Sequence, residues 1–127
     1  MLSYLTIGTN DPAKSHAFYD AVLGTIGWSK HTEFGDWRAY GLGGRKEGQS
    51  IWVCPPHDKQ AATFGNGSMI GFGAKSHAEV HAFYDAAMAN GGSDEGPPGP
   101  RAHYGPTWYS AYLRDPTGNK LAIVFNG

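Results

Sequence analysis

A compact set of side chains that could do chemistry lies between residues 101 and 104. Arg101, His103 and Tyr104 offer a fork of guanidinium donors for an anion, an imidazole that titrates near neutral pH, and a hydroxyl. Prolines frame this segment, in Gly96-Pro97-Pro98-Gly99-Pro100 before it and in Gly105-Pro106 after it. Because such a loop loses little entropy when it becomes ordered, it can hold polar groups in fixed positions. The alternative is an exposed connection in which Arg101 pairs with a carboxylate.

Two more histidines, His77 and His81, stand four residues apart on an expected helix, which is the spacing that zinc proteases use. Glu79 occupies the third place of this segment rather than the second, so the general-base geometry of those enzymes is absent. Glu79 also completes a helix-capping pattern with Ser76. We therefore expect two solvent-facing histidines here rather than a metal site.

Length, charge and cysteine content exclude several classes of function. The 127 residues fit one domain, and 10 Lys and Arg against 11 Asp and Glu leave no basic face for nucleic acid. No apolar stretch approaches the roughly 20 residues of a spanning helix, so we expect no membrane partner and a cytoplasmic location. Cys54 is the only cysteine, which excludes an internal disulfide and a thiolate cluster for zinc. We expect it to be a small buried residue.

A duplication organises the elements that would carry these side chains. The segment His-Ala-Phe-Tyr-Asp-Ala occupies residues 16–21 and recurs unchanged at residues 81–86, 65 positions later. Each half predicts a strand, a helix and three short β-like runs. The expected strands are 2–9, 29–34, 36–42 and 49–54 in the first half, and 69–74, 101–104, 108–114 and 120–125 in the second. The expected helices begin at Pro12 and after Ser76, and each ends at glycines, near 24–27 and 91–92.

The predicted fold class is α+β, because a helix covers one face of a mostly antiparallel sheet in each half. A single domain is expected, made of repeats at about residues 1–56 and 67–127. Each helix contains Phe-Tyr, and residues 114–120 read Arg-Asp-Pro-Thr-Gly-Asn-Lys, a turn that closes a hairpin. With these features the sequence resembles the vicinal oxygen chelate superfamily, which includes glyoxalases, extradiol dioxygenases and bleomycin-resistance proteins. The resemblance implies a curled mixed sheet around an open cleft for a small ligand, and a homodimer.

The resemblance also implies metal ligands, a His that opens each unit and a Glu near the end of each unit. These positions fall on Tyr4, Trp52, Met69 and Ala122. A phenol, an indole, a thioether and a methyl group offer almost none of the imidazole and carboxylate donors that divalent ions prefer. We therefore expect a member of the family without its metal and without another cofactor.

Strand alternation predicts which residues line the cleft, because successive side chains face opposite sides of a sheet. Matching Ala39-Tyr40 of the first unit with Ala111-Tyr112 of the second places both tyrosines on the cleft side. No catalytic residue is assigned. The predicted ligand-binding residues are Tyr4, Arg38, Tyr40, Trp52, Met69, Arg101, His103, Tyr104, Ser110 and Tyr112. So many aromatic side chains favour a flat or aromatic small molecule as the partner.

Several functions follow from these patterns. The preferred one is a non-catalytic small-molecule binder of the sequestering kind found among resistance proteins. A metal-dependent lyase or dioxygenase of the same family would need ligands elsewhere, for which only His103 is a candidate. A metal-independent acid–base enzyme would use Arg101, His103 and a tyrosine. A purely structural role would leave the two units that frame a cleft unexplained.

Overall fold

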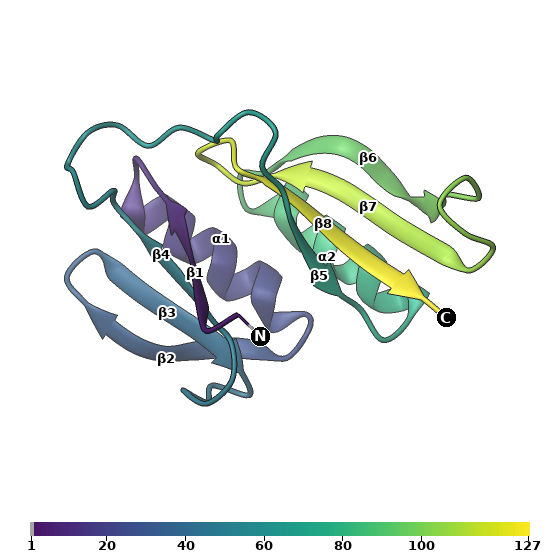
Figure 1. The fold of residues 1–127 in the computed structure, drawn as a ribbon, viewed down its shortest axis with the longest axis horizontal. Helices are drawn as coiled ribbons and strands as arrows, with labels where there is room; N and C mark the ends of the chain where they lie inside the picture. Colours follow the sequence, from purple (N-terminus) through teal and green to yellow (C-terminus); the bar gives the residue numbers. More distant parts are fainter. Residues whose placement is uncertain (1) are drawn as a thin grey trace.

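The computed structural model describes residues 2–127 and contains two units with the same order of elements (Figure 1). The first unit consists of β1 (Tyr4–Gly8), α1 (Pro12–Gly24), β2 (Trp28–Phe34), β3 (Trp37–Leu42) and β4 (Ser50–Cys54). The second consists of β5 (Ile70–Gly73), α2 (His77–Ala89), β6 (Ser93–Pro100), β7 (Trp108–Arg114) and β8 (Lys120–Asn126). The predicted β-α-β-β-β order is therefore confirmed in both halves.

Each unit forms its own four-stranded mixed sheet. The strand orders are β1-β4-β3-β2 and β5-β8-β7-β6, and these are equivalent when the two units are compared. In each sheet the first and last strands of the unit are parallel, and the remaining neighbours are antiparallel. The expected α+β class is confirmed.

Both helices begin where side chains satisfy free backbone N–H groups. The Asp11 carboxylate accepts from the Lys14 N–H at 3.2 Å, and the Ser76 hydroxyl accepts from the Glu79 N–H at 3.1 Å. Glu79 in turn accepts from the Lys75 N–H at 2.8 Å, which gives it the expected capping role. Among residues 2–127, neither helix is long and apolar enough to cross a membrane.

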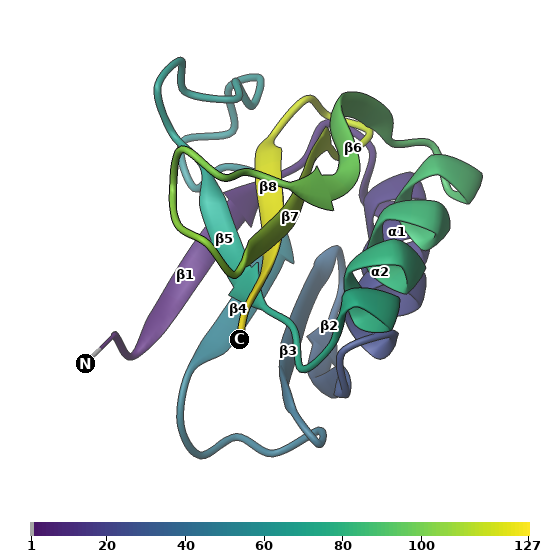
Figure 2. The same ribbon diagram turned by 90° about the vertical axis from the view of Figure 1, so that its right-hand side faces the viewer.

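The helices lie on the same side of the two sheets, and Figure 2 shows them together with the strands on the other side. One continuous core fills the space between helices and sheets and extends through both units. Phe18 of α1 and Phe83 of α2, which are equivalent under the duplication, are both fully buried in it. We call the opposite side of the sheets, which no helix covers, the front face.

The proline-rich segment differs from its prediction. We expected residues 96–100 to form a loop and residues 101–104 to form a weak strand. Instead β6 runs from Ser93 to Pro100 along the edge of the second sheet, with register shifts, and residues 102–104 form a turn. Proline is tolerated there because an edge strand needs only some of its N–H groups for pairing.

Candidate functional site

The front face of the first sheet carries a hollow of about 430 Å³ that is walled by aromatic side chains. Tyr4 on β1, Trp52 on β4, and Phe34 and Trp37 at the β2–β3 turn line it. The rings of Phe34 and Trp37 stack at 5.9 Å, and the Trp52 ring lies 6.0 Å from each of them. Tyr4 and Phe34 are 61% and 58% exposed, so their faces are open to a ligand.

A second aromatic hollow, of about 570 Å³, lies on the front face of the second sheet. Tyr104, Trp108 and Tyr112 form its walls, together with Met69. The Trp108 indole N–H donates to the Ser110 hydroxyl at 3.2 Å, which fixes the orientation of that ring. Ser110 itself is fully buried, so it positions Trp108 and does not reach the hollow.

A third hollow, of about 250 Å³, lies at the junction of the two units. We call it the junction hollow. It shares Thr6 with the first hollow, and it shares Met69 and Lys120 with the second. The three hollows therefore adjoin one another across the front face.

The structure places five of the ten predicted site residues on these hollows: Tyr4, Trp52, Met69, Tyr104 and Tyr112. Whether they bind a ligand stays a prediction. The sequence reasoning missed the aromatic residues Phe34, Trp37 and Trp108 as parts of the hollows. Trp108 could have been found, because it lies two residues before Ser110 on the same side of β7.

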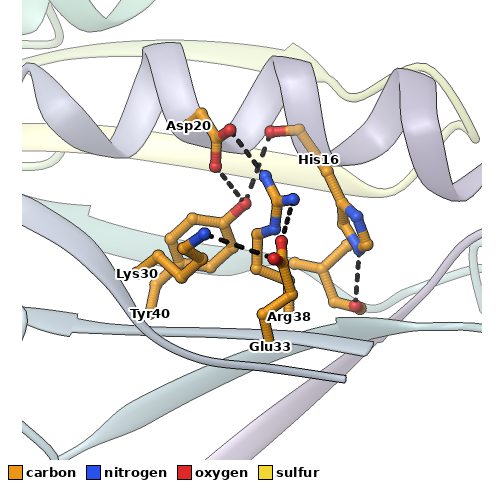
Figure 3. A network of polar contacts seen from close by, with 7 residues as sticks. His16, Asp20, Lys30, Glu33, Arg38 and Tyr40 are labelled. Carbon is orange, nitrogen blue, oxygen red and sulfur yellow. Dashed lines mark hydrogen bonds and ion pairs between the residues drawn. The ribbon is translucent and has the colours of Figure 1, made fainter. Parts of the chain in front are cut away.

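Arg38 and Tyr40 do not face the hollows, and their predicted orientation was wrong. Figure 3 shows both side chains pointing from the strands toward α1. The Tyr40 hydroxyl donates to Asp20 at 2.7 Å, and the Arg38 guanidinium donates to the other oxygen of that carboxylate at 2.7 Å. Arg38 also pairs with Glu33. This cluster therefore ties β2 and β3 to α1 on the side away from the front face.

The reason for the wrong orientation is a one-residue error in matching the units. Trp52 pairs with Thr6 and Ala39, whereas Ala122 pairs with Gly71 and Tyr112. Because Thr6 and Gly71 are equivalent, Ala39 corresponds to Tyr112 and not to Ala111. A shift of one residue moves every side chain of a strand to the other face of its sheet.

Burial and hydrogen bonds shift the pKa values of two groups in the cluster formed by Asp20, Glu33, Arg38 and Tyr40. Burial, followed by the hydrogen bond to Asp20, raises the pKa of the Tyr40 hydroxyl far above its ordinary value. The hydrogen bond from Arg38 lowers the pKa of Glu33. Nearby, His16 forms a 3.1 Å hydrogen bond with the Val53 carbonyl (Figure 3). The hydrogen bonds of these groups stay within the fold, which indicates a structural role, and among the described residues only the Nε atom of Arg38 is buried without a partner.

Arg101 and His103 also lie outside the hollows. The Arg101 guanidinium donates to the carbonyls of Gly99 and Pro97, both at 2.9 Å, and lies 5.6 Å from the Tyr112 ring centroid. The Arg101 guanidinium therefore stabilises the end of β6, and these donors are not directed at an anion. His103 is exposed at the turn and packs against Tyr104 at 4.1 Å.

The positions that would carry the family's metal do not fit one. Tyr4, Trp52 and Met69 line the hollows, and Ala122 is almost fully buried. None of the four is an imidazole or a carboxylate, the donors that such a metal needs. Within residues 2–127, no group of three or more His, Cys, Asp or Glu is arranged to hold a metal ion.

The remaining candidates from the sequence take other roles. His77 stacks on the Tyr109 ring at 3.8 Å, and His81 forms a 2.6 Å hydrogen bond with the Tyr109 hydroxyl. Both histidines are exposed, as expected. Cys54 is fully buried at the base of the first hollow, and burial raises the pKa of its thiol, which disfavours the reactive thiolate.

Known proteins share this architecture. The family model of the Glyoxalase/Bleomycin resistance protein/Dioxygenase superfamily matches residues 1–123. A glyoxalase/bleomycin resistance protein from Albidiferax ferrireducens T118 is 39% identical, with a TM-score of 0.87 over 100% of this chain and 99% of that chain. No curated protein matches the chain.

Two further structures show the same fold at low identity. The fosfomycin resistance protein FosX from Listeria monocytogenes is 19% identical, with a TM-score of 0.70 over 100% of this chain and 93% of that chain. Lactoylglutathione lyase from Agrobacterium tumefaciens is 19% identical, with a TM-score of 0.68 over 98% and 92% of the two chains.

Proposed function

Because the chain belongs to the Glyoxalase/Bleomycin resistance protein/Dioxygenase superfamily, we propose that it binds a flat or aromatic small molecule on its front face without the family's metal. The observation that carries this proposal is the aromatic hollow around Trp52. Four aromatic side chains meet there, and two of them, Tyr4 and Trp52, occupy positions at which the resemblance implies metal ligands. Apolar walls with few polar groups are typical of small-molecule sites.

The chemistry of such a site is stacking and burial of apolar surface. Trp37 and Trp52 present rings at 67° to each other, so a planar ligand can lie against one indole while its edge meets the other. Burial of an aromatic ring contributes on the order of 1–3 kcal/mol. Two such hollows on adjoining sheets support a ligand with more than one apolar group.

The alternative functions receive no support from the side-chain arrangement. A metal-dependent lyase or dioxygenase needs donors that Tyr4, Trp52, Met69 and Ala122 do not provide. The residues expected to serve a metal-independent acid–base enzyme lie outside the hollows, because Arg101 donates to its own loop and His103 lies on the exposed turn. Binding without reaction is the function that the arrangement favours.

The protein partner that we propose is a second copy of this chain. All three hollows are open, and several large apolar side chains on or beside the front face are about half exposed, among them Tyr4, Phe34, Met69 and Tyr104. A homodimer would cover part of this apolar surface, and large exposed apolar patches commonly mark such interaction sites.

Substitution of Trp52 tests the proposed function. Trp52→Ala is expected to weaken an aromatic ligand roughly 5- to 150-fold, because each 1.4 kcal/mol is about tenfold in affinity. Isothermal titration calorimetry with a panel of aromatic acids and neutral aromatics measures this. Tyr84→Ala, which removes an aromatic ring from α2, is the matched control and should bind like the wild type.

The same titration after dialysis against a chelator should give unchanged affinity. Unchanged binding by Trp52→Ala would show that the ligand does not use the first hollow. A loss of binding after chelation would favour the metal-dependent alternative instead.

A further inference from the structure

The junction hollow differs in chemistry from the two aromatic hollows beside it. Its walls include the hydroxyl side chains of Thr6, Thr63 and Ser68, and the ammonium side chain of Lys120. Within residues 2–127, none of these four side chains forms a hydrogen bond or ion pair with the rest of the chain. Hydroxyl and ammonium donors without internal partners are the groups that bind oxyanions.

Lys120 is the cation that this hollow shares with the second aromatic hollow. Its side chain is half-buried at the start of β8. The carboxylate lining the same aromatic hollow belongs to Glu95, which lies 3.5 Å from the Arg114 guanidinium and is neutralised by it. The positive charge of Lys120 is therefore the uncompensated charge at the boundary between the two hollows.

The walls around Lys120 are held in place by the rest of the fold. Asn119, the preceding residue, donates to the Gly8 carbonyl at 2.9 Å and to Asp115 at 2.8 Å, which fixes the start of β8 against β1. On the other side, Asn10 forms two hydrogen bonds with the backbone of Ala62, at 3.0 and 2.7 Å. A wall fixed before binding reduces the entropy that a ligand must overcome.

Residues 55–69, the linker between β4 and β5, form a sharp turn beside the hollow. Gly65 and Gly67 have φ angles of 63° and 101°, which favour glycine, and they bring Ser68 back toward β8. Phe64 packs under the Arg114 guanidinium at 5.1 Å and anchors this turn. The linker thus forms a defined side of the hollow.

We propose that the junction hollow is an oxyanion subsite in which Lys120, assisted by the hydroxyls of Thr6, Thr63 and Ser68, binds the carboxylate or phosphate group of an aromatic ligand. This deepens the proposed function and rests on it. The ring of the ligand lies against Trp52 in the first hollow, which shares Thr6 with the junction hollow. Lys120 is then a specificity-determining residue that selects anionic aromatic molecules over neutral ones.

A matched pair of ligands tests this selection. Indole-3-acetate and indole-3-acetamide share a ring and differ in charge, so their affinities report on the anion subsite. Lys120→Met is expected to weaken the acetate roughly 10- to 100-fold and to change the amide less than about twofold, because a hydrogen bond to a charged group is lost for the acetate alone. Lys46→Met removes the same charge from an exposed position outside the hollows and should leave both affinities unchanged.

Equal weakening of the acetate and the amide by Lys120→Met would overturn the subsite, while binding itself would stand. An unchanged affinity of the acetate would overturn it as well. Phenyl phosphate in the same titration distinguishes the two sources of the anion, since tighter binding than the acetate assigns the subsite to phosphate.

Inorganic phosphate alone separates this inference from the proposed function. In amide NMR spectra of the wild type, millimolar phosphate is expected to shift the signals of Thr6, Ser68 and Lys120, and Lys120→Met should abolish these shifts. Shifts without binding of any aromatic compound would support the subsite and refute the proposed function. Absence of shifts in the wild type would refute the subsite even if aromatic compounds bind.

Discussion

The same six residues, His-Ala-Phe-Tyr-Asp-Ala, lie in α1 and in α2, and their polar side chains meet different surroundings. Tyr19 of α1 is fully buried and donates to Asp115 of the other unit at 2.7 Å. Tyr84 of α2 is half-buried and donates to Asp94 of its own unit at 2.9 Å. The tyrosine of one copy therefore donates a hydrogen bond across the units, and the tyrosine of the other donates within its own unit.

The aspartates of the two copies differ in the same way. Asp20 accepts hydrogen bonds from Arg38 and Tyr40 on β3, whereas Asp85 is exposed. On β7 the residues that correspond to Arg38 and Tyr40 are Ala111 and Leu113, which offer no polar group. Identical helix residues can thus have different surroundings, because the residues of the facing strand decide which hydrogen bonds form.

The largest expected effect concerns what the two copies share. Phe18→Ala and Phe83→Ala should each lower the free energy of unfolding by about 3–5 kcal/mol, because both rings are fully buried and each substitution leaves a cavity. Urea denaturation measures both. Phe34→Ala, a front-face residue that is 58% exposed, is the control and should cost less than about 1 kcal/mol. A large difference between Phe18→Ala and Phe83→Ala would break the structural equivalence of the copies.

The tyrosines should separate the copies. Tyr19→Phe is expected to lower the free energy of unfolding by about 1.5–3 kcal/mol, because it removes a buried hydrogen bond to a carboxylate. Tyr84→Phe should cost less than about 0.5 kcal/mol, since water can replace Tyr84 as a partner of Asp94. Thermal or urea denaturation of the two variants checks the difference, and equal costs would show that the bond across the units contributes nothing.

The smallest effect appears at alkaline pH. Burial, followed by the charge of Asp115, raises the pKa of Tyr19 well above its usual value of 10.0. The unfolded chain releases this proton near pH 10 and the native chain retains it, so the stabilisation is complete below pH 10 and is lost as the pH rises above it. From pH 10 to 11 the wild type should lose up to about 1.4 kcal/mol more stability than Tyr19→Phe. Urea titrations at both pH values measure this, and parallel losses would contradict it.

The sequence predicted the parts of the fold that depend on local chemistry. The caps at Asp11 and Ser76 form where they were expected, and strand alternation correctly placed Ile7, Phe72 and Ile123 in the core. Helix caps and strand alternation can be predicted locally, because each depends only on the residues within one helix or strand. The duplication added the equivalence of the helices.

The errors arose where the two units differ in length. The chain between the helix and the third strand is longer in the second unit, where it contains β6 and a turn at residues 102–104. The offset of 65 residues that aligns the two helices therefore does not align β3 with β7. The shared Ala-Tyr pair suggested a match that is one residue out of register, and it placed Arg38 and Tyr40 on the wrong face.

The role of Arg101 could not be predicted from the sequence either. Its guanidinium donates hydrogen bonds to the carbonyls of Pro97 and Gly99, which lie where the pairing of β6 with β7 becomes irregular. Whether an arginine donates to a ligand or to its own loop depends on which carbonyls the irregular strand leaves free. Lys120, at a regular strand start, had no such competing acceptors.

The hydrogen bonds that join the units also impose an order on events during synthesis. Tyr19 and Asp115 are 96 positions apart, and Asn119 is 111 positions from the Gly8 carbonyl to which it donates. While the ribosome is still making the second unit, the first has neither of these partners. Its packing is completed only when the closing hairpin emerges. Contacts between such distant positions slow folding, because the long intervening chain must be ordered before they form.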